Sequence, residues 1–219
     1  AAVNEDESIY VVVITCAGDK TFCAGSRLEH MLRSGVDVTE LAGSDLVETN
    51  VARAVAGIDR PVIAAVNGAA MGQGLELALS CDIRIASEQA CFGFPQVALG
   101  LIPSDGGTQR LPRLIGRGKA VELIFTADTV SAEEALEIGL VSKVVPGTAL
   151  AAAAEALAQT IAGKAPVALR YVKEAVNKGL DLTLEQGLRL ETDLYLLLHT
   201  TSDRTEGIRA FLEKRPPHF

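Results

Sequence analysis

Residues 67–82 contain three glycines and a glutamate, which could together form a backbone site for a negative oxygen with an acid–base group beside it. Gly68, Gly72 and Gly74 fall where an apolar run ends and a helical pattern begins. Backbone N–H groups in the first turn of a helix lack partners within the helix, and the helix dipole favours negative charge there, so this turn can hold an anionic oxygen. Glu76, on an otherwise apolar stretch, is a candidate acid or base. The alternative is a glutamate that only interacts with the helix dipole.

A second glycine-bearing turn, residues 22–28, follows the first predicted strand and can supply another backbone donor. Two N–H donors from separate loops form an oxyanion hole, which stabilises a carbonyl compound as it becomes an enolate. Loss of one such donor typically slows a reaction about 10²–10³-fold. The alternative is a tight turn that simply requires Gly25.

The elements that must position these groups are visible as hydrophobic patterns. Residues 9–15 and 61–68 are continuous apolar runs typical of strands covered on both faces, and shorter runs occupy 83–86 and 141–145. Helical patterns lie between them, at 45–57, 72–80 and 131–139. After Pro146 the patterns are helical throughout: 148–163, 166–178, 182–198 and 203–214. The sequence therefore predicts an α/β core over residues 1–145 and a helical region over 146–219.

Composition excludes several classes of protein. The 219 residues carry a net charge of −8 without a block of Lys or Arg, which argues against nucleic-acid binding. No apolar run approaches the roughly 20 residues that span a bilayer. The four cysteines form no C-x-x-C pair and the three histidines are scattered, which favours reduced thiols in a reducing compartment and no metal site. Leu77 replaces the third glycine of a dinucleotide fingerprint, so no nucleotide cofactor is expected.

Ordered motifs along the whole chain carry a resemblance to a known family. They occupy residues 21–25, 60–68, 74–78, 81–84, 107–116, 135–141 and 203–217. With these motifs the sequence resembles the crotonase superfamily, the enoyl-CoA hydratase/isomerase proteins. The resemblance implies a right-handed spiral of ββα turns with a C-terminal helical trimerisation region. It also implies a further strand and helix before Ala1, where the sequence reads like the last turn of a helix.

The resemblance assigns roles to individual positions. The thioester oxygen would accept hydrogen bonds from the backbone N–H groups of Ser26 and Gln73, and Glu76 falls on the first catalytic glutamate of the hydratases. The second hydratase glutamate would follow Pro95, where this chain has Gln96, whose amide can orient water but cannot exchange a proton at neutral pH. Asp105 matches an acid/base aspartate of the dienoyl-CoA isomerase branch, with an N-cap as the alternative.

Contacts with the acyl-CoA substrate are implied at eight positions: Ala24, Ser26, Arg27, Leu28, Glu29, Gly72, Phe211 and Lys214, the last two in the same or a neighbouring subunit. CoA is part of the substrate, so no separate cofactor is expected.

The sequence thus predicts an acyl-CoA enzyme that stabilises a thioester enolate, with reversible hydration of a 2-enoyl-CoA as the main hypothesis. The alternatives are an enoyl- or dienoyl-CoA isomerase or an alicyclic enoyl-CoA hydratase that uses Asp105, and a non-catalytic CoA-binding scaffold. The expected assembly is a homotrimer or a dimer of trimers, in the bacterial cytoplasm or the mitochondrial matrix.

Overall fold

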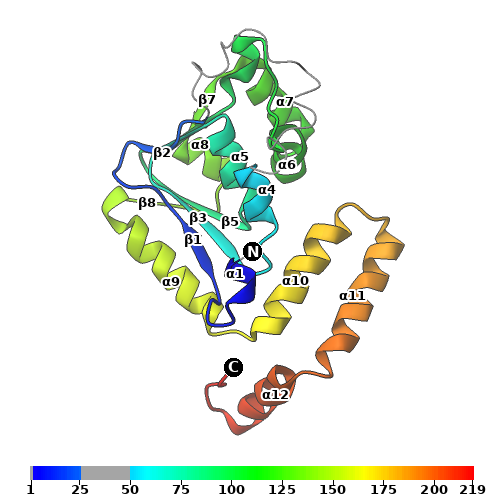
Figure 1. The fold of residues 1–219 in the computed structure, drawn as a ribbon. Coiled ribbons are helices and arrows are strands. Elements are labelled where there is room, and N and C mark those ends of the chain that lie inside the picture. The colour runs from blue at the N-terminus through cyan, green and yellow to red at the C-terminus, as the bar shows by residue number, and fades with distance from the viewer. Residues whose placement is uncertain (1, 26–49) are drawn as a thin grey trace. The chain divides into compact units, whose positions relative to one another are not determined.

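The computed structural model describes residues 2–25 and 50–219. Its contacts divide the chain into two compact units (Figure 1). The larger unit comprises residues 13–57 and 62–154, and the helical unit comprises 1–12, 58–61 and 155–219. The division predicted from the sequence pattern, after residue 145, stays a prediction.

Two four-stranded sheets form the framework of the larger unit, in the orders β1-β3-β5-β8 and β2-β4-β6-β7. The strands of the first sheet are β1 (Val12–Ile14), β3 (Val62–Val66), β5 (Ile83–Ser87) and β8 (Lys143–Val145). Those of the second are β2 (Thr21–Cys23), β4 (Ala69–Met71), β6 (Cys91–Gly93) and β7 (Thr129–Ser131). From β1 to β6 the strands alternate between the two sheets, in line with the ββα repeat that the sequence resemblance implies, whereas β6 and β7 both belong to the second sheet.

Parallel pairing and burial explain the continuous apolar runs. β3 pairs with β5, β5 with β8, β2 with β4 and β4 with β6, all parallel, whereas β6 and β7 are antiparallel. Every residue of β3 is buried, as the run at residues 61–68 predicts. The strand predicted at 9–15 is shorter than expected, because Ile9 donates to the Asp6 carbonyl in a turn and β1 begins only at Val12.

Among the described residues of the larger unit, α5 and α8 contact the strands of these sheets. The helices there are α4 (Val51–Ala56), α5 (Gln73–Ser80), α6 (Gly107–Ile115), α7 (Arg117–Thr126) and α8 (Ala132–Glu137), with 3₁₀ turns η1 (Pro95–Leu99) and η2 (Gly147–Ala149). α5 contacts both α4 and α6. At the C-terminal end of α5, the Arg84 side chain donates hydrogen bonds to the Ala78 and Cys81 carbonyls. The core around α5 contains fully buried Leu75, Phe92 and Leu111. Each such side chain contributes about 1.5–3 kcal/mol on burial.

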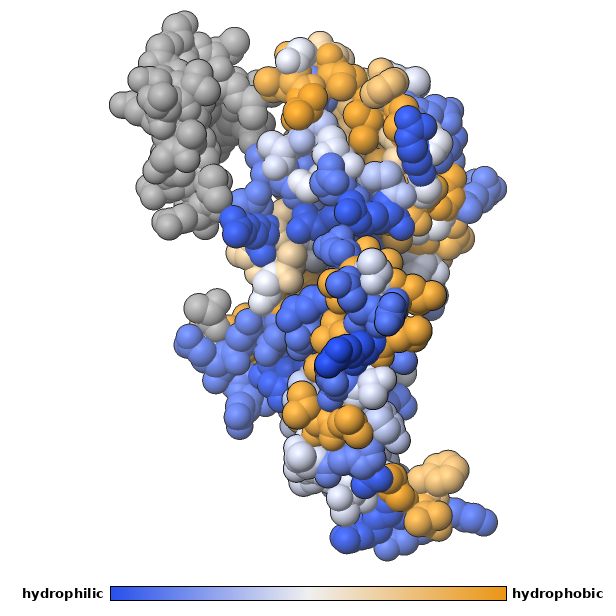
Figure 2. Space-filling model, turned by 90° about the vertical axis from the view of Figure 1, so that its right-hand side faces the viewer, coloured by the Kyte–Doolittle hydropathy of each residue, from blue (hydrophilic) through white to orange (hydrophobic). Residues whose placement is uncertain are grey.

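The helical unit contains α1 (Ala2–Glu5), α10 (Pro166–Gly179), α11 (Leu184–Leu198) and α12 (Ser202–Glu213), and α9 (Leu150–Ala162) spans the boundary between the units. These helices confirm the four predicted after Pro146. Thr183 and Gln186 form a complete capping box that fixes the start of α11. Apolar surface remains exposed on three helices (Figure 2), at Val172, Val176, Leu184, Leu188, Tyr195, Phe211 and Leu212.

In the part of the chain that the structure describes, no helix is both long and apolar enough to cross a bilayer. The four cysteines carry no disulfide.

Candidate active site

Glu76 lies in the buried first turn of α5. The helix begins at Gln73, after Gly72, whose φ of 56° and ψ of −119° suit a residue without a Cβ. The backbone N–H of Glu76 donates to the Gly72 carbonyl, and neighbouring Leu75 and Ala78 are fully buried. The Glu76 side chain is itself 0% exposed. Glu76 is therefore an ionisable residue surrounded by core side chains. A carboxylate at such a position requires hydrogen-bonding or charged partners that stabilise it.

The two carboxylate oxygens of Glu76 have different surroundings. Oε1 accepts hydrogen bonds from the backbone N–H groups of Asp105, at 2.7 Å, and Gly107, at 2.8 Å. Oε2 is buried and has no hydrogen-bond partner among the described residues. Buried polar atoms without partners are rare, so Oε2 is the atom at which a water or substrate hydrogen is expected.

Burial raises the pKa of Glu76 above its ordinary value of 4.5. The hydrogen bonds from Gly107 and Asp105 oppose this, because they favour the ionised form, while the negative charge of Asp105 raises the pKa further. The net pKa is raised. A carboxyl group whose pKa moves toward neutrality can both take up and release a proton, which is what general acid–base catalysis requires.

The turn that holds Glu76 precedes α6. Gly106 adopts a φ of 108°, which favours glycine, and it is the N-cap of α6 without a side-chain cap. The alternative role of Asp105 as that N-cap is therefore wrong. A Cβ on Gly107 would lie 2.8 Å from the Phe94 ring and from Pro103, so the turn packs directly on the core. Close packing at Gly107 fixes one of the two N–H groups that donate to Glu76 Oε1.

Gln96 lies beside the same helix start. Its Nε2 is 3.2 Å from the place a Cβ on Gly72 would occupy, and its Oε1 is buried without a partner. The Gly72 N–H is not available to it, because that group donates to the Gly93 carbonyl at 2.9 Å. In the described part of the chain, Glu76 Oε2 and Gln96 Oε1 are the two buried side-chain acceptors without a partner.

The turn after β2 meets the same helix start. Gly25 has a φ of 88°, and a Cβ there would lie 3.4 Å from the Gln73 nitrogen and 3.1 Å from the Met71 carbonyl oxygen. The two glycine-bearing turns, 48 positions apart in sequence, are thus neighbours in space. Ser26, the other predicted oxyanion donor, lies outside the described residues, as do Arg27, Leu28 and Glu29. Ala24 is exposed at the end of this turn.

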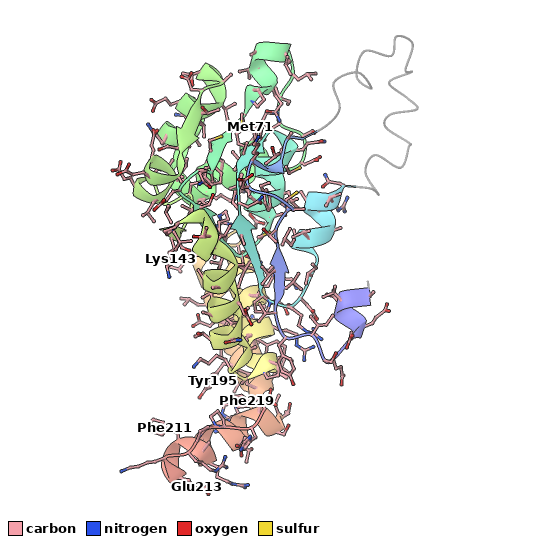
Figure 3. The ribbon with its side chains drawn as sticks, turned by 90° about the vertical axis from the view of Figure 1, so that its left-hand side faces the viewer. Met71, Lys143, Tyr195, Phe211, Glu213 and Phe219 are labelled. Carbon is pink, nitrogen blue, oxygen red and sulfur yellow. The ribbon has the colours of Figure 1, made fainter. Side chains whose placement is uncertain are left out.

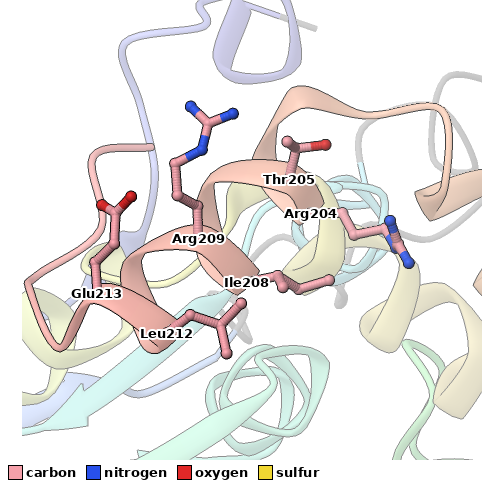
Figure 4. A pocket seen from close by; sticks show the side chains of 6 residues that line it. All are labelled: Arg204, Thr205, Ile208, Arg209, Leu212 and Glu213. Atoms are coloured by element: carbon pink, nitrogen blue, oxygen red, sulfur yellow. The ribbon is translucent and has the colours of Figure 1, made fainter.

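Phe211 and Lys214 belong to the helical unit. Phe211 lies on the outer surface of α12 and is 83% exposed (Figure 3). Lys214 ends the helix with a φ of 54°. A surface hollow of about 330 Å³ runs along the same helix (Figure 4), lined by Arg204, Thr205, Ile208, Arg209, Leu212 and Glu213. The predicted CoA contacts of Phe211 and Lys214 stay predictions.

The structure brings together five of the predicted residues, namely Gly72, Gln73, Glu76, Gln96 and Asp105. The sequence analysis missed Asn50, whose Nδ2 donates to Asp105 Oδ1 at 2.7 Å. The sequence pattern predicted a helix over 45–57 with Asn50 inside it, whereas the structure begins α4 at Val51 with Asn50 as its N-cap. Within residues 2–25 and 50–219, no three His, Cys, Asp or Glu side chains are arranged to hold a metal ion.

Known proteins are similar to this chain in both sequence and fold. The family model described as enoyl-CoA hydratase/isomerase matches residues 1–219. A crotonyl-CoA hydratase from Syntrophomonas wolfei is 43% identical over 218 residues, which cover 100% of this chain and 83% of the relative. A short-chain-enoyl-CoA hydratase from Clostridium acetobutylicum is 42% identical over 213 residues, or 97% of this chain and 81% of the relative.

Among solved structures, the enoyl-CoA hydratase from Bacillus anthracis superposes with a TM-score of 0.92 at 44% identity, and the match covers 100% of this chain and 84% of that one. The structure has the crotonase fold, which confirms the predicted fold class. The chain belongs to the enoyl-CoA hydratase/isomerase family.

Proposed function

We propose that this protein is an enoyl-CoA hydratase that adds water reversibly to a 2-enoyl-CoA, with Glu76 as the acid–base residue. The observation that carries the proposal is the state of the Glu76 carboxylate: fully buried, held through Oε1 by two backbone N–H groups, and unpartnered at Oε2. The relatives named as hydratases support the same reaction.

In the proposed reaction the thioester oxygen accepts hydrogen bonds from the backbone N–H groups of Gln73 and Ser26. Glu76 Oε2 takes a proton from water as the water oxygen bonds to the β-carbon. The electrons of the double bond move toward the thioester oxygen, and the resulting enolate takes a proton at the α-carbon. Because Glu76 then holds the proton taken from water, the same carboxyl group can return it.

Gln96 differs from a second glutamate in what it can contribute. Its Oε1 can accept the remaining hydrogen of the attacking water and so orient the lone pair, but the amide cannot supply a proton. The buried, unpartnered state of this oxygen supports that role. Proton delivery is therefore assigned to Glu76 alone in hydration.

An isomerase activity that uses Asp105 is the second candidate. It is favoured because Asp105 belongs to the turn that binds Glu76 Oε1, which places a second carboxylate-bearing residue at the site that lacks a second glutamate. If both activities are present, Asp105→Asn should abolish double-bond migration and preserve hydration.

The proposal includes a homotrimer or dimer of trimers, supported by the exposed apolar residues of α10, α11 and α12. It needs no cofactor beyond the CoA of the substrate. The proposed compartment is the bacterial cytoplasm or the mitochondrial matrix, supported by four cysteines without a disulfide.

The test is turnover of straight-chain and cyclic 2-enoyl-CoAs, followed by loss of the conjugated thioester absorbance with products identified by mass. Glu76→Gln should lower kcat by about 10²–10⁴-fold. Glu137→Gln, on the exposed side of α8, is the matched control and should leave kcat unchanged. Undiminished turnover in Glu76→Gln would remove Glu76 from the mechanism, and tight CoA-ester binding without turnover in the wild type would favour the scaffold alternative.

A further inference from the structure

Asp105 is fixed at three of its atoms. Its backbone N–H donates to Glu76 Oε1, its carbonyl accepts from Arg110 Nη1, and its Oδ1 accepts from Asn50 Nδ2, each at 2.7 Å. The first contact holds the carboxylate of Glu76. The other two restrict where Asp105, whose N–H makes that first contact, can lie. Asn50 is therefore joined to Glu76 through a single residue.

Asn50 uses both ends of its amide. Its Oδ1 accepts from the Arg53 backbone N–H at 2.8 Å and caps α4, while its Nδ2 donates to Asp105. Asp and Ser cap helices about as well as Asn does. A capping Asp has no hydrogen to donate to Asp105, and the shorter Ser side chain does not match the reach of Asn. Capping alone therefore does not require Asn here, whereas the contact with Asp105 does.

We propose that Asn50 is a positioning residue for the reaction, acting through Asp105 to hold the turn whose N–H groups bind Glu76 Oε1. The inference rests on the proposed function, because it concerns the carboxylate assigned there to proton transfer. Because these N–H groups hold Oε1, the Glu76 carboxylate presents its other oxygen, Oε2, to the reacting atoms in a single orientation. Gly107 is held by its packing on the core, whereas the Asp105 side of the turn has the backbone freedom of Gly106, at a φ of 108°, to shift if the Asn50 contact is lost.

The hydrogen bond from Asn50 also fixes the position of the Asp105 carboxylate. The carboxylate of Asp105 raises the pKa of Glu76, so the location of that carboxylate affects when Glu76 ionises. The other ionisable side chains on the elements packed against α5 are Cys23 on β2, Arg53 on α4, and Arg110 and Arg113 on α6. Of these, Arg110 is itself bound to the Asp105 carbonyl.

Asn50→Asp tests this role without removing the cap. The new side chain has the same shape and can still accept from Arg53, but it places a carboxylate against Asp105 where a donor stood. We expect kcat for hydration to fall about 10–100-fold, since a misplacement of 1 Å can cost that much. KM should change less than about 3-fold, and the melting temperature should stay within a few degrees, because the cap is preserved.

The double variant Asn50→Asp/Asp105→Asn reverses the contact, because the amide at position 105 can then donate to the carboxylate at position 50. It should recover most of the kcat lost in Asn50→Asp. Asp105→Asn alone should move the pH profile of kcat/KM to lower pH, because it removes the charge that raises the pKa of Glu76. Wild-type kcat in Asn50→Asp, or a double variant no faster than Asn50→Asp, would overturn the inference.

A separate readout keeps this test independent of the proposed function. The pKa of Glu76 can be read from the pH dependence of the free energy of unfolding, with Glu76→Gln variants as the reference. If the wild type hydrates no enoyl-CoA, the proposed function fails, but a changed Glu76 pKa in Asn50→Ser, which keeps a capping side chain and adds no charge, would still support the positioning role. An unchanged pKa in that variant would refute it.

Discussion

A single methyl group at Gly74 should separate the two turns that form the candidate site. Gly74 is the second residue of α5, and a Cβ there would overlap the Cys23 carbonyl oxygen, 2.6 Å from the carbonyl carbon and 2.8 Å from the Cys23 Cβ. Carbon atoms in contact lie about 3.5–4.0 Å apart. Gly74→Ala therefore requires the start of α5 to move about 1 Å away from β2.

Two losses follow from that movement. Overpacking of a core contact costs about 1–3 kcal/mol of the free energy of unfolding, because backbone atoms cannot rotate aside. Gln73, the residue just before Gly74, carries the proposed oxyanion N–H. A displacement of about 1 Å at such a donor can lower kcat about 10²-fold. Crotonyl-CoA hydration and urea denaturation measure the two losses separately.

Gly118→Ala is the matched control. Gly118 lies in α7, and a Cβ there meets no atom within 4 Å, so the substitution should leave kcat unchanged and raise stability by about 0.4–1 kcal/mol. If Gly74→Ala keeps wild-type kcat and wild-type stability, the close approach of α5 to β2 does not position the site, and the reasoning from Gly74 to Gln73 is refuted.

Three further predictions concern other parts of the same unit. Because the folded pKa of Glu76 is raised, the wild type should lose stability relative to Glu76→Gln as pH rises from about 4.5 through that pKa, and pH-independent relative stability would contradict this burial effect. Gln96→Glu adds a second proton carrier and should raise hydration kcat up to about 10²-fold, measured at several pH values; an unchanged or lower kcat would argue against the orienting role. Arg84→Met removes the guanidinium donor of the Leu140 and Cys81 carbonyls, while the Ala78 carbonyl keeps the Cys81 N–H, and it should cost about 2–4 kcal/mol on chemical denaturation; a loss below about 1 kcal/mol would show that water replaces the guanidinium.

Hydrophobic pattern predicted the strands of one sheet but not those of the other. The runs at 9–15, 61–68, 83–86 and 141–145 mark β1, β3, β5 and β8, although β1 and β8 have only three residues. The four strands of the second sheet are also three residues long, but they lie outside these runs. Only the family resemblance implied these short strands, as the second members of the ββα turns.

Glu76 was identifiable because a carboxylate on an apolar helix start is chemically conspicuous. The hydrogen bonds that hold its carboxylate could not be predicted. They come from the N–H groups of Asp105 and Gly107, 29 to 31 positions away, and a backbone donor leaves no signal in the type of side chain. Asn50 was missed because the helical pattern at 45–57 placed it inside a helix, and because its bond to Asp105 depends on how α4 and α6 pack around α5.

The most direct measurement is a crystal structure with an unreactive acyl-CoA thioester bound. It should place the thioester oxygen within about 3 Å of the backbone nitrogens of Gln73 and Ser26, and Glu76 Oε2 on the side of the acyl chain where the β-carbon lies. A thioester bound elsewhere, or a Glu76 carboxylate directed away from the acyl carbons, would contradict the assignment of proton transfer to this residue.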